Sequence, residues 1–177
     1  ASIFGLDSAK KSTEVKSKVG YLAGDFEMYN NLTGKQYLEF VAHLRHCEDV
    51  DAQIAELSER LEATLTKKIG TLSRGNMQKI ALIAALLHDP DLLILDEPTT
   101  GLDPLMQNRF YELVKERVKR GKTVFMSSHI LSEVQQICDR VAFMKEGRLV
   151  EIVDIHKVRA SNKKEIRLKI TKGTKPM

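Results

Sequence analysis

Two adjacent carboxylates follow an uninterrupted apolar run near the middle of the chain. Asp96 and Glu97 come directly after residues 92–95, and Pro98 follows them. An aspartate at the end of a strand is suited to hold Mg²⁺, often through water, and the adjacent glutamate can polarise an attacking water as a general base. The same pair can serve only to cap the turn before Pro98, and an isolated pair would favour that simpler interpretation.

A histidine follows the next short apolar segment. Residues 123–127 predict a strand, and His129 comes two positions after its end, in the sequence Ser-Ser-His. Because ligands gather at the carboxyl ends of parallel strands, His129 is placed to meet a γ-phosphate or the attacking water. A lone histidine is more often structural, so this hypothesis depends on the neighbouring carboxylates.

A second candidate site opens a predicted helix upstream. It consists of Leu72, Ser73, Arg74, Gly75 and Asn76. A helix N-terminus that offers backbone N–H groups, a glycine and a serine hydroxyl is able to bind an anion. The alternative is plain N-capping of the helix by Ser73.

A phosphate-binding site of this kind normally includes a glycine-rich loop, and the 177 residues contain none. The expected pattern is G-x-x-x-x-G-K followed by Ser or Thr. The Gly-Lys-Thr at residues 121–123 lacks the earlier glycine at the required spacing and stands at a predicted helix end. Half of the expected nucleotide site is therefore missing from these residues.

Hydrophobic periodicity predicts the elements that must position these residues. The continuous apolar run at residues 92–95 predicts a strand that is buried on both faces, as in a parallel sheet. Strands and helices alternate in the second half, which indicates an α/β fold. We expect strands at residues 18–22, 91–95, 123–127, 140–144 and 149–153, with a further strand at residues 165–170 in the tail. We expect helices at residues 35–47 and 51–63, after the segment 72–75, and at residues 105–120 and 131–138.

Composition bounds the classes of function. The net charge of +4 is mild, and an ordinary polar tail explains the basic residues 163–177 better than a nucleic-acid or lipid patch does. Two cysteines fit a reducing compartment, and no apolar run reaches the eighteen or so residues that a membrane-spanning helix needs. His43, His46 and Cys47 have the spacing of metal ligands on one helix face, but an ordinary polar helix end is the favoured interpretation.

Taken together and in this order, the motifs resemble the nucleotide-binding cassette of ABC transporters. LSRGNMQ matches the signature loop of that family, LLILDEP its Walker B segment, GLDP its D-loop and SSHIL its switch histidine. VGYLAGDF matches the Q-loop region, and the resemblance covers about residues 3–151. The residues around LSRGN and YLAGDF are most similar to those of cassettes that serve drug, antibiotic or polysaccharide exporters.

The resemblance implies an α/β fold with a P-loop NTPase-type parallel sheet and an inserted α-helical subdomain. Residues 1–155 would form the ATPase domain, with residues 31–87 as the helical subdomain and residues 1–30 and 88–155 as the RecA-like core. Residues 156–177 would be a C-terminal extension. Since the phosphate loop of the family precedes the region matched by ASIFG, we expect an N-terminally truncated cassette with an incomplete sheet, inactive on its own.

The same resemblance implies a dimeric ATPase that uses ATP and Mg²⁺ and powers a transmembrane permease. It would lie in the cytoplasm, peripheral to the membrane, with a second cassette as partner and no nucleic acid. Glu97 would activate water, Asp96 would hold Mg²⁺, His129 would sense the γ-phosphate and Asp103 would cross the interface. The signature residues Leu72, Ser73, Arg74, Gly75 and Asn76 would cap ATP held by the partner chain.

Three positions depart from the family pattern. Gly24 stands where the family has the glutamine that touches Mg²⁺ and the attacking water, Arg74 replaces a glycine, and Asn76 replaces a glutamine. Two other functions stay open at this point. One is an ABC-type ATPase that acts in translation or DNA processing without a membrane. The other is a remnant that binds a partner cassette but no nucleotide by itself.

Overall fold

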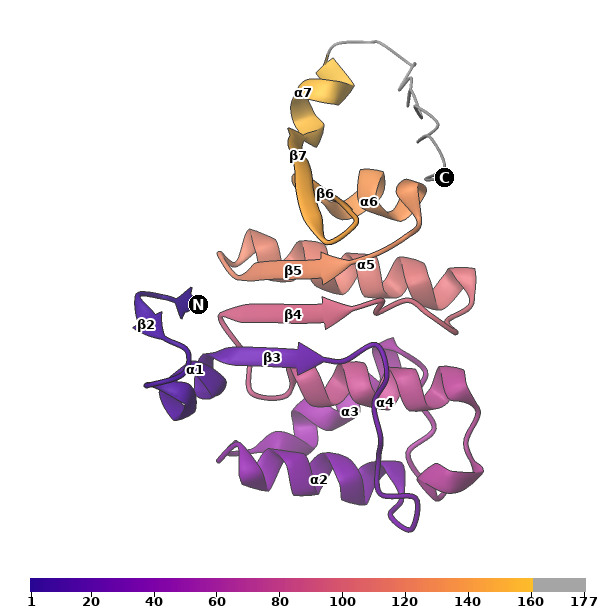
Figure 1. Cartoon of the computed structure of the whole chain (residues 1–177). Helices are drawn as coiled ribbons and strands as arrows, with labels where there is room; N and C mark the ends of the chain where they lie inside the picture. Colours follow the sequence, from indigo (N-terminus) through magenta and orange to yellow (C-terminus); the bar gives the residue numbers. More distant parts are fainter. Residues whose placement is uncertain (161–177) are drawn as a thin grey trace, which may run out of the picture. The chain divides into compact units, whose positions relative to one another are not determined.

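The computed structural model describes residues 1–160 (Figure 1). It divides into two compact units, Ala1–His129 and the described part of Ile130–Met177. The first unit holds every residue that we expect at the nucleotide site.

A three-stranded parallel sheet forms the centre of the first unit. Its strands are β3 (Val19–Leu22), β4 (Leu92–Asp96) and β5 (Thr123–Ser127), in the order β3-β4-β5. The register pairs Leu22 with Leu95 and Asp96 with Ser127, so all three strands end at the same edge of the sheet. The predicted strands at these three places are confirmed within one residue.

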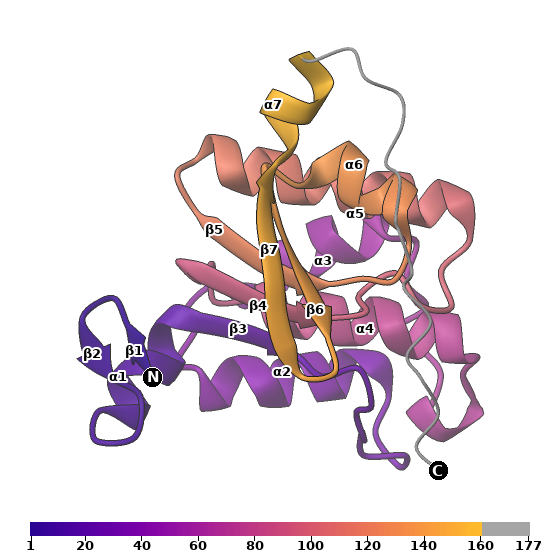
Figure 2. The same cartoon turned by 45° about the horizontal axis from the view of Figure 1, so that its top comes forward.

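Two helices cover one face of this sheet. α4 (Arg74–Leu86) packs against β3, and α5 (Pro104–Lys119) packs against β5 (Figures 1 and 2). Gly20 of β3 permits the close approach of α4, because a Cβ atom at this position would lie only 2.1 Å from the carbonyl oxygen of Ala85. The side chains that this face buries are Leu22, Leu93 and Leu95.

The opposite face of the sheet is more open than the sequence predicts. Tyr21 is 59% exposed and Phe125 is 65% exposed, and Ile94 between them is half-buried. The prediction that the run at residues 92–95 is buried on both faces is therefore wrong for this face, where Leu92 and Ile94 are only half-buried. The physical reason is that α4 and α5 both lie on the other face, so burial alternates along β4.

The chain between β3 and α4 is helical, as predicted. It contains α2 (Gly34–Leu44), α3 (Val50–Arg60) and the short 3₁₀ helix η1 (Ile69–Thr71). α2 begins with a reciprocal capping box, in which the Thr33 hydroxyl accepts from the Gln36 N–H and the Gln36 side chain accepts from the Thr33 N–H. The buried side chains of α2 and α3 are Leu38, Ala42, Ile54 and Leu57.

α2 ends three residues earlier than the predicted helix at residues 35–47. His46 and Asp49 adopt left-handed backbone conformations with φ of 54° and 48°, so they lie in the turn that leads to α3. His43, His46 and Cys47 therefore do not share a helix face. Within residues 1–160, no group of three potential metal-ligating side chains is arranged to hold an ion.

The start of the chain contains elements that periodicity does not reveal. β1 (Ser2–Ile3) and β2 (Leu6–Asp7) form a small antiparallel pair, and α1 (Ser12–Lys18) follows. The Asp7 carboxylate accepts hydrogen bonds from the backbone N–H groups of Ala9 and Lys10, and these bonds hold the pKa of Asp7 below its ordinary value. Two-residue strands are too short to show an alternating pattern, and α1 buries only Val15, so it has no apolar face for periodicity to detect.

The second unit is built around an antiparallel hairpin. β6 (Arg140–Lys145) pairs with β7 (Arg148–Asp154) through a turn at Glu146 and Gly147, and both turn residues have positive φ angles, as such hairpin turns require. α6 (Leu131–Ile137) precedes the hairpin and α7 (Ile155–Ala160) follows it. The predicted elements at residues 131–138, 140–144 and 149–153 are thus present.

Two further predictions from the sequence stay predictions. The strand expected at residues 165–170 lies outside the described residues. The division into a domain of residues 1–155, with its helical subdomain, and a C-terminal extension stays a prediction. Among the described residues, none of the helices has both the length and the apolar character required to traverse a bilayer.

Candidate functional site

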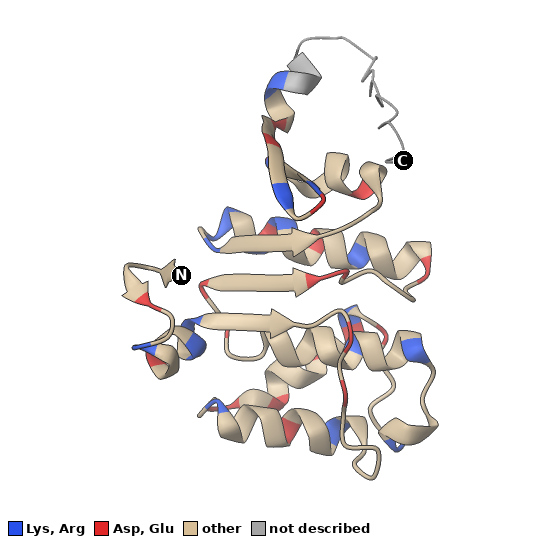
Figure 3. Ribbon diagram, viewed as in Figure 1, with Lys and Arg blue, Asp and Glu red and all other residues tan. Residues whose placement is uncertain are grey.

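The carboxyl edge of the β3-β4-β5 sheet gathers four of the predicted site residues. Gly24 follows β3, Asp96 and Glu97 end β4, and His129 follows β5. Figure 3 shows acidic residues where β4 ends. Because the three strands are parallel and in register, residues from distant parts of the chain meet here.

Asp96 lies between a hydroxyl and a glycine. The Ser127 hydroxyl donates a hydrogen bond to Oδ1 of Asp96. On the other side, a Cβ atom at Gly24 would lie 2.8 Å from Oδ2, so the Asp96 carboxylate fills the space that a side chain at position 24 would need. The exposed carboxylate and its hydroxyl neighbour are oxygen ligands of the kind that Mg²⁺ prefers, so the residues fit that ion.

Glu97 has an unusual backbone. Its φ of 47° lies in the left-handed region, which costs a residue with a side chain about 1 kcal/mol or more. The Glu97 N–H donates to the Ser127 hydroxyl oxygen at 3.0 Å, and this bond helps to hold the conformation. Strained backbone of this kind persists where the surroundings impose it, which is common at functional sites.

The Glu97 carboxylate and the His129 imidazole form a close pair. Nδ1 of His129 is 2.9 Å from both Oε1 and Oε2 of Glu97. The His129 side chain is 75% exposed and that of Glu97 is 31% exposed, so solvent reaches both groups. A carboxylate that is oriented by an imidazole and open to water is placed to accept a proton from an attacking water.

The signature residues lie at the start of α4. The Ser73 hydroxyl accepts from the Asn76 N–H at 3.3 Å, which is an N-cap hydrogen bond. The Asn76 side chain accepts from the Thr64 N–H at 2.7 Å and donates to the Thr64 carbonyl at 2.9 Å. Asn76 therefore fastens the preceding loop to the helix. Leu72 is half-buried, whereas Arg74 is exposed.

Two glycines bring the signature loop against the segment after β4. A Cβ atom at Gly75 would lie 2.6 Å from the carbonyl oxygen of Gly101, and Gly101 itself has a φ of 79°. Glycine suits both positions, because Gly75 has no side chain to meet that carbonyl and Gly101 adopts a positive φ without steric cost. Two residues later, Asp103 caps α5, because its Oδ1 accepts from the Met106 N–H at 3.0 Å.

The predicted site residues thus form two groups. Gly24, Asp96, Glu97 and His129 make the strand-end group, and Leu72–Asn76 with Asp103 make the group at the start of α4. Buried Gln78 links them, because its Nε2 donates to the carbonyl of Pro98 at 2.9 Å. Our sequence analysis assigned no role to Gln78 or Ser127. The available signal for Ser127 was its place as a polar residue at the end of a strand.

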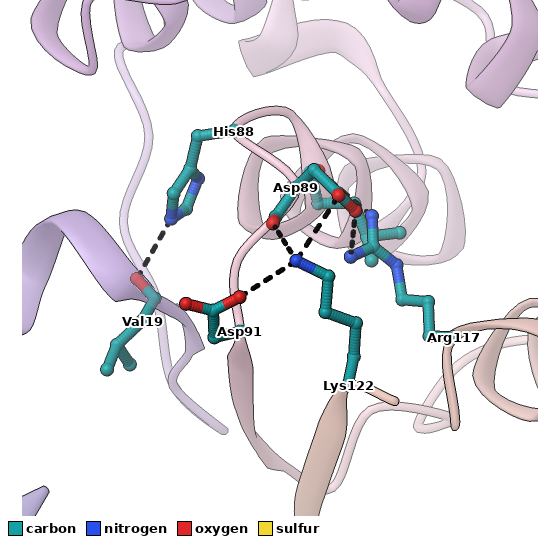
Figure 4. Close-up of polar contacts among 7 residues, drawn as sticks. Val19, His88, Asp89, Asp91, Arg117 and Lys122 are labelled. Carbon is teal, nitrogen blue, oxygen red and sulfur yellow. Dashed lines mark hydrogen bonds and ion pairs between the residues drawn. The ribbon is translucent and has the colours of Figure 1, made fainter. Parts of the chain in front are cut away.

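The opposite edge of the same sheet carries a second set of charges (Figure 4). We call Asp89, Asp91, Arg117 and Lys122 the amino-end cluster. Arg117 Nη1 donates to Oδ1 of Asp89 at 3.0 Å, and Lys122 Nζ lies 2.9 Å from Oδ1 of Asp91 and 3.4 Å from Oδ2 of Asp89. The hydrogen bond between the Lys122 and Asp91 side chains lowers the pKa of Asp91 and raises the pKa of Lys122.

Two further contacts anchor this cluster to the fold. Buried Arg117 also donates from Nη2 to the carbonyl of Leu86, the last residue of α4, at 3.1 Å. Nε2 of His88 lies 3.1 Å from the carbonyl oxygen of Val19 in β3 (Figure 4). Burial lowers the pKa of Arg117 and that of His88. Arg117 thus joins α5 to the end of α4, and the neighbouring His88 contacts β3.

Comparisons with known proteins show what this chain is similar to. A family model described as "AAA domain, putative AbiEii toxin, Type IV TA system" matches residues 60–134. Over 156 residues the chain is 36% identical to the ABC transporter ATP-binding protein NatA of Bacillus subtilis (strain 168), which covers 84% of this chain and 63% of NatA. The relatives are ATP-binding proteins of ABC transporters, in agreement with the resemblance of the motifs.

Two further relatives agree. The bacitracin transport ATP-binding protein BcrA of Bacillus licheniformis is 34% identical over 182 aligned residues, which cover 98% of this chain and 57% of BcrA. The solved structure of an ATP-binding subunit of an ABC transporter superposes with a TM-score of 0.81 at 27% identity, covering 90% of this chain and 68% of that chain. The predicted P-loop NTPase-type α/β fold is confirmed. The chain spans about three fifths of the length of the curated relatives.

Proposed function

We propose that this chain is part of an ATP-hydrolysing subunit that powers an ABC exporter. The observation that carries the proposal is the carboxylate–imidazole pair of Glu97 and His129 beside Asp96, at the carboxyl edge of the parallel sheet. The kinship with a bacitracin transport protein supports export of a drug-like or antibiotic-like substrate. It also favours transport over the alternative of an ATPase that acts in translation or DNA processing.

Glu97 acts as the general base in this proposal. Water attacks the γ-phosphorus of ATP, the bond to the β-phosphate oxygen breaks, and the proton of the attacking water moves to the Glu97 carboxylate. The His129 imidazole holds that carboxylate at 2.9 Å from both oxygens, and its exposed ring is within reach of a phosphate. Glu97 follows β4 directly and has a left-handed backbone, so the strand conformation ends at Asp96.

Asp96 is the residue that would hold Mg²⁺, directly or through water. Bound there, the ion would neutralise charge on the phosphate oxygens. The chain contributes a carboxylate that is already oriented by the Ser127 hydroxyl. Gly24 cannot reach the ion with a side chain, and its backbone lies instead against the Asp96 carboxylate.

The start of α4 would bind the nucleotide of a partner cassette. Its backbone N–H groups and the positive end of the helix dipole favour a phosphate there. The hydroxyl of Ser73 caps the helix in the isolated chain, and the contact of Gly75 with Gly101 joins this loop to the segment that leads to Asp103. We propose that residues 72–76 and Asp103 face the second cassette of a dimer.

The remaining parts of the proposal concern the setting. The helical segment of residues 31–87 would contact a transmembrane permease, which would place the cassette at the cytoplasmic side of the membrane. These 177 residues hold no glycine-rich phosphate loop. We therefore expect them to bind ATP only weakly by themselves, because such a loop supplies most of the grip on the β- and γ-phosphates. Calorimetric titration with Mg-ATP measures this directly.

The decisive experiment replaces the general base. The assay needs a protein in which this chain is joined to a glycine-rich phosphate loop and hydrolyses ATP. In that protein Glu97→Gln should lower turnover at least about a hundredfold. The reason is that the glutamine side chain has nearly the size of glutamate but does not accept a proton from water. ATP binding should persist. Glu112→Gln, on the exposed side of α5, is the matched control and should keep turnover unchanged. Near-normal turnover in the Glu97 variant would show that this residue has another role.

A further inference from the structure

One hydroxyl group lies at the meeting point of the two proposed catalytic carboxylates. Ser127 ends β5 and is the register partner of Asp96 in β4. Its Oγ donates to the Asp96 carboxylate and also accepts from the Glu97 N–H at 3.0 Å. A serine hydroxyl has one donor and two acceptor positions, so these two bonds are mutually compatible.

We propose that Ser127 is the positioning residue of this ATPase site. Its single hydroxyl sets the direction of the Asp96 carboxylate and stabilises the backbone conformation from which the Glu97 side chain projects. The inference rests on the proposed function, because it assigns to Ser127 an effect on the two residues that act there. Ser127 itself touches neither water nor phosphate in this scheme, so it acts only through Asp96 and Glu97.

The energetic argument begins with Glu97. A left-handed backbone at a residue with a side chain is unfavourable, and it persists only where neighbouring groups favour it. The Ser127 hydroxyl is such a group, because it accepts a hydrogen bond from the Glu97 N–H only when the Asp96–Glu97 peptide faces β5. Removing the hydroxyl would free the peptide to relax, and the carboxylate that pairs with His129 would move with it.

Gly24 supplies the other half of this arrangement. The Asp96 carboxylate can lie against Ser127 only because position 24 has no side chain, since a Cβ atom there would be 2.8 Å from Oδ2 and 3.1 Å from Cγ. The φ angle of Gly24 lies outside the left-handed range, so alanine can adopt its backbone conformation. An alanine at position 24 should therefore push the Asp96 side chain away from Ser127 without breaking the strand.

The first test removes and restores the hydroxyl. In the chain without nucleotide, Ser127→Ala should raise the hydrogen-exchange rate of the Glu97 amide roughly tenfold, the effect of losing one such hydrogen bond. Ser127→Thr keeps a hydroxyl and should restore slow exchange. Thr123→Val, at the other end of β5, is the matched control for general loosening of the strand and should leave the Glu97 amide unchanged.

The second test approaches Asp96 from the opposite side. In the ATP-hydrolysing protein, Gly24→Ala and Ser127→Ala should both raise the Mg²⁺ concentration needed for half-maximal turnover, because both misdirect the Asp96 carboxylate. Ser127→Ala should in addition lower turnover at saturating Mg²⁺, since it also releases Glu97. Gly24→Ala leaves the bond between Glu97 and Ser127 in place, so it should affect saturated turnover less.

These outcomes separate the inference from the function on which it rests. Unchanged exchange of the Glu97 amide in Ser127→Ala, or equal exchange in the alanine and threonine variants, overturns the positioning role even if Glu97 proves to be the base. Faster exchange that threonine restores, combined with normal turnover in Glu97→Gln, supports the positioning geometry but removes the proposed catalytic role. If Ser127→Ala does not fold, Ser127→Thr and Gly24→Ala still decide the matter.

Discussion

The two edges of the central sheet carry similar residues but opposite physical character. At the amino edge, Asp89 and Asp91 are fixed by Arg117 and Lys122, and the Arg117 side chain is only 4% exposed. At the carboxyl edge, Asp96 is exposed, and Glu97 meets a His129 side chain that is 75% exposed. The amino-edge carboxylates are therefore paired with a buried guanidinium and a largely covered ammonium group, whereas the Glu97 carboxylate is paired with an exposed imidazole.

Backbone strain alone does not distinguish the two edges. Asp89 has a φ of 42° and Glu97 a φ of 47°, so each edge contains a left-handed residue with a side chain. What differs is the surroundings of the carboxylate. Asp89 pairs with the side chains of Arg117 and Lys122, which are mostly covered by the protein. Glu97 pairs instead with the exposed imidazole of His129. The comparison teaches that the partner of the carboxylate and the exposure of that partner, rather than strain, mark the candidate site.

The largest difference should appear when one carboxylate at each end of β4 loses its charge. Asp96→Asn should lower ATP turnover at least about a hundredfold, because it removes the proposed Mg²⁺ ligand, and it should hardly change the thermal unfolding temperature. Asp91→Asn should keep turnover and lower the unfolding temperature instead. Equal effects of the two variants on turnover would abolish the distinction between a functional and a structural edge.

A large effect on stability should follow from removing the guanidinium of the amino-end cluster. Arg117→Met keeps much of the apolar stem but leaves the Leu86 carbonyl and Asp89 without their partner. We expect the free energy of unfolding, measured in urea, to fall by about 3 kcal/mol. Lys119→Met, on an exposed position of the same helix, should change it by less than about 0.5 kcal/mol. A loss for Arg117→Met as small as that of the control would contradict the anchoring role.

The smallest effect concerns pH. Burial is the main cause that lowers the pKa of His88, and the nearby Arg45 and Arg117 act in the same direction, whereas Asp89 and the Val19 carbonyl oppose them. Because the folded pKa lies below the unfolded value of about 6.5, neutral His88 contributes stability above that pH, and this stability is lost as pH falls through the folded pKa. The slope from this one proton cannot exceed about 1.4 kcal/mol per pH unit.

Replacing the histidine tests this assignment. His88→Gln should flatten the decline of unfolding free energy below about pH 6.5, because glutamine does not titrate. Equilibrium unfolding in urea at several pH values measures the slope. The control is His43→Gln, at an exposed position of α2. An unchanged slope in the His88 variant would mean that this group does not contribute to the acid sensitivity of the fold.

Much of the fold could be predicted because the relevant patterns are local. The apolar spacing of α2, the Gly121 stop after α5 and the apolar run of β4 each act within a few residues of sequence. Errors arose where tertiary packing decides. α2 ends at Leu44 because His46 turns into a left-handed conformation, and β4 buries one face more than the other because both covering helices lie on the same side.

The candidate site divides in the same way. The sequence by itself determined that Asp96, Glu97 and His129 end strands, and that Ser73 and Gly75 begin a helix, because motif order and strand ends are properties of short segments. Only the tertiary structure decided that Ser127 bonds to both Asp96 and Glu97 and that Gly24 leaves room for the Asp96 carboxylate. These contacts depend on strand register and on close approaches of about 3 Å between residues far apart in the chain, which no local pattern encodes.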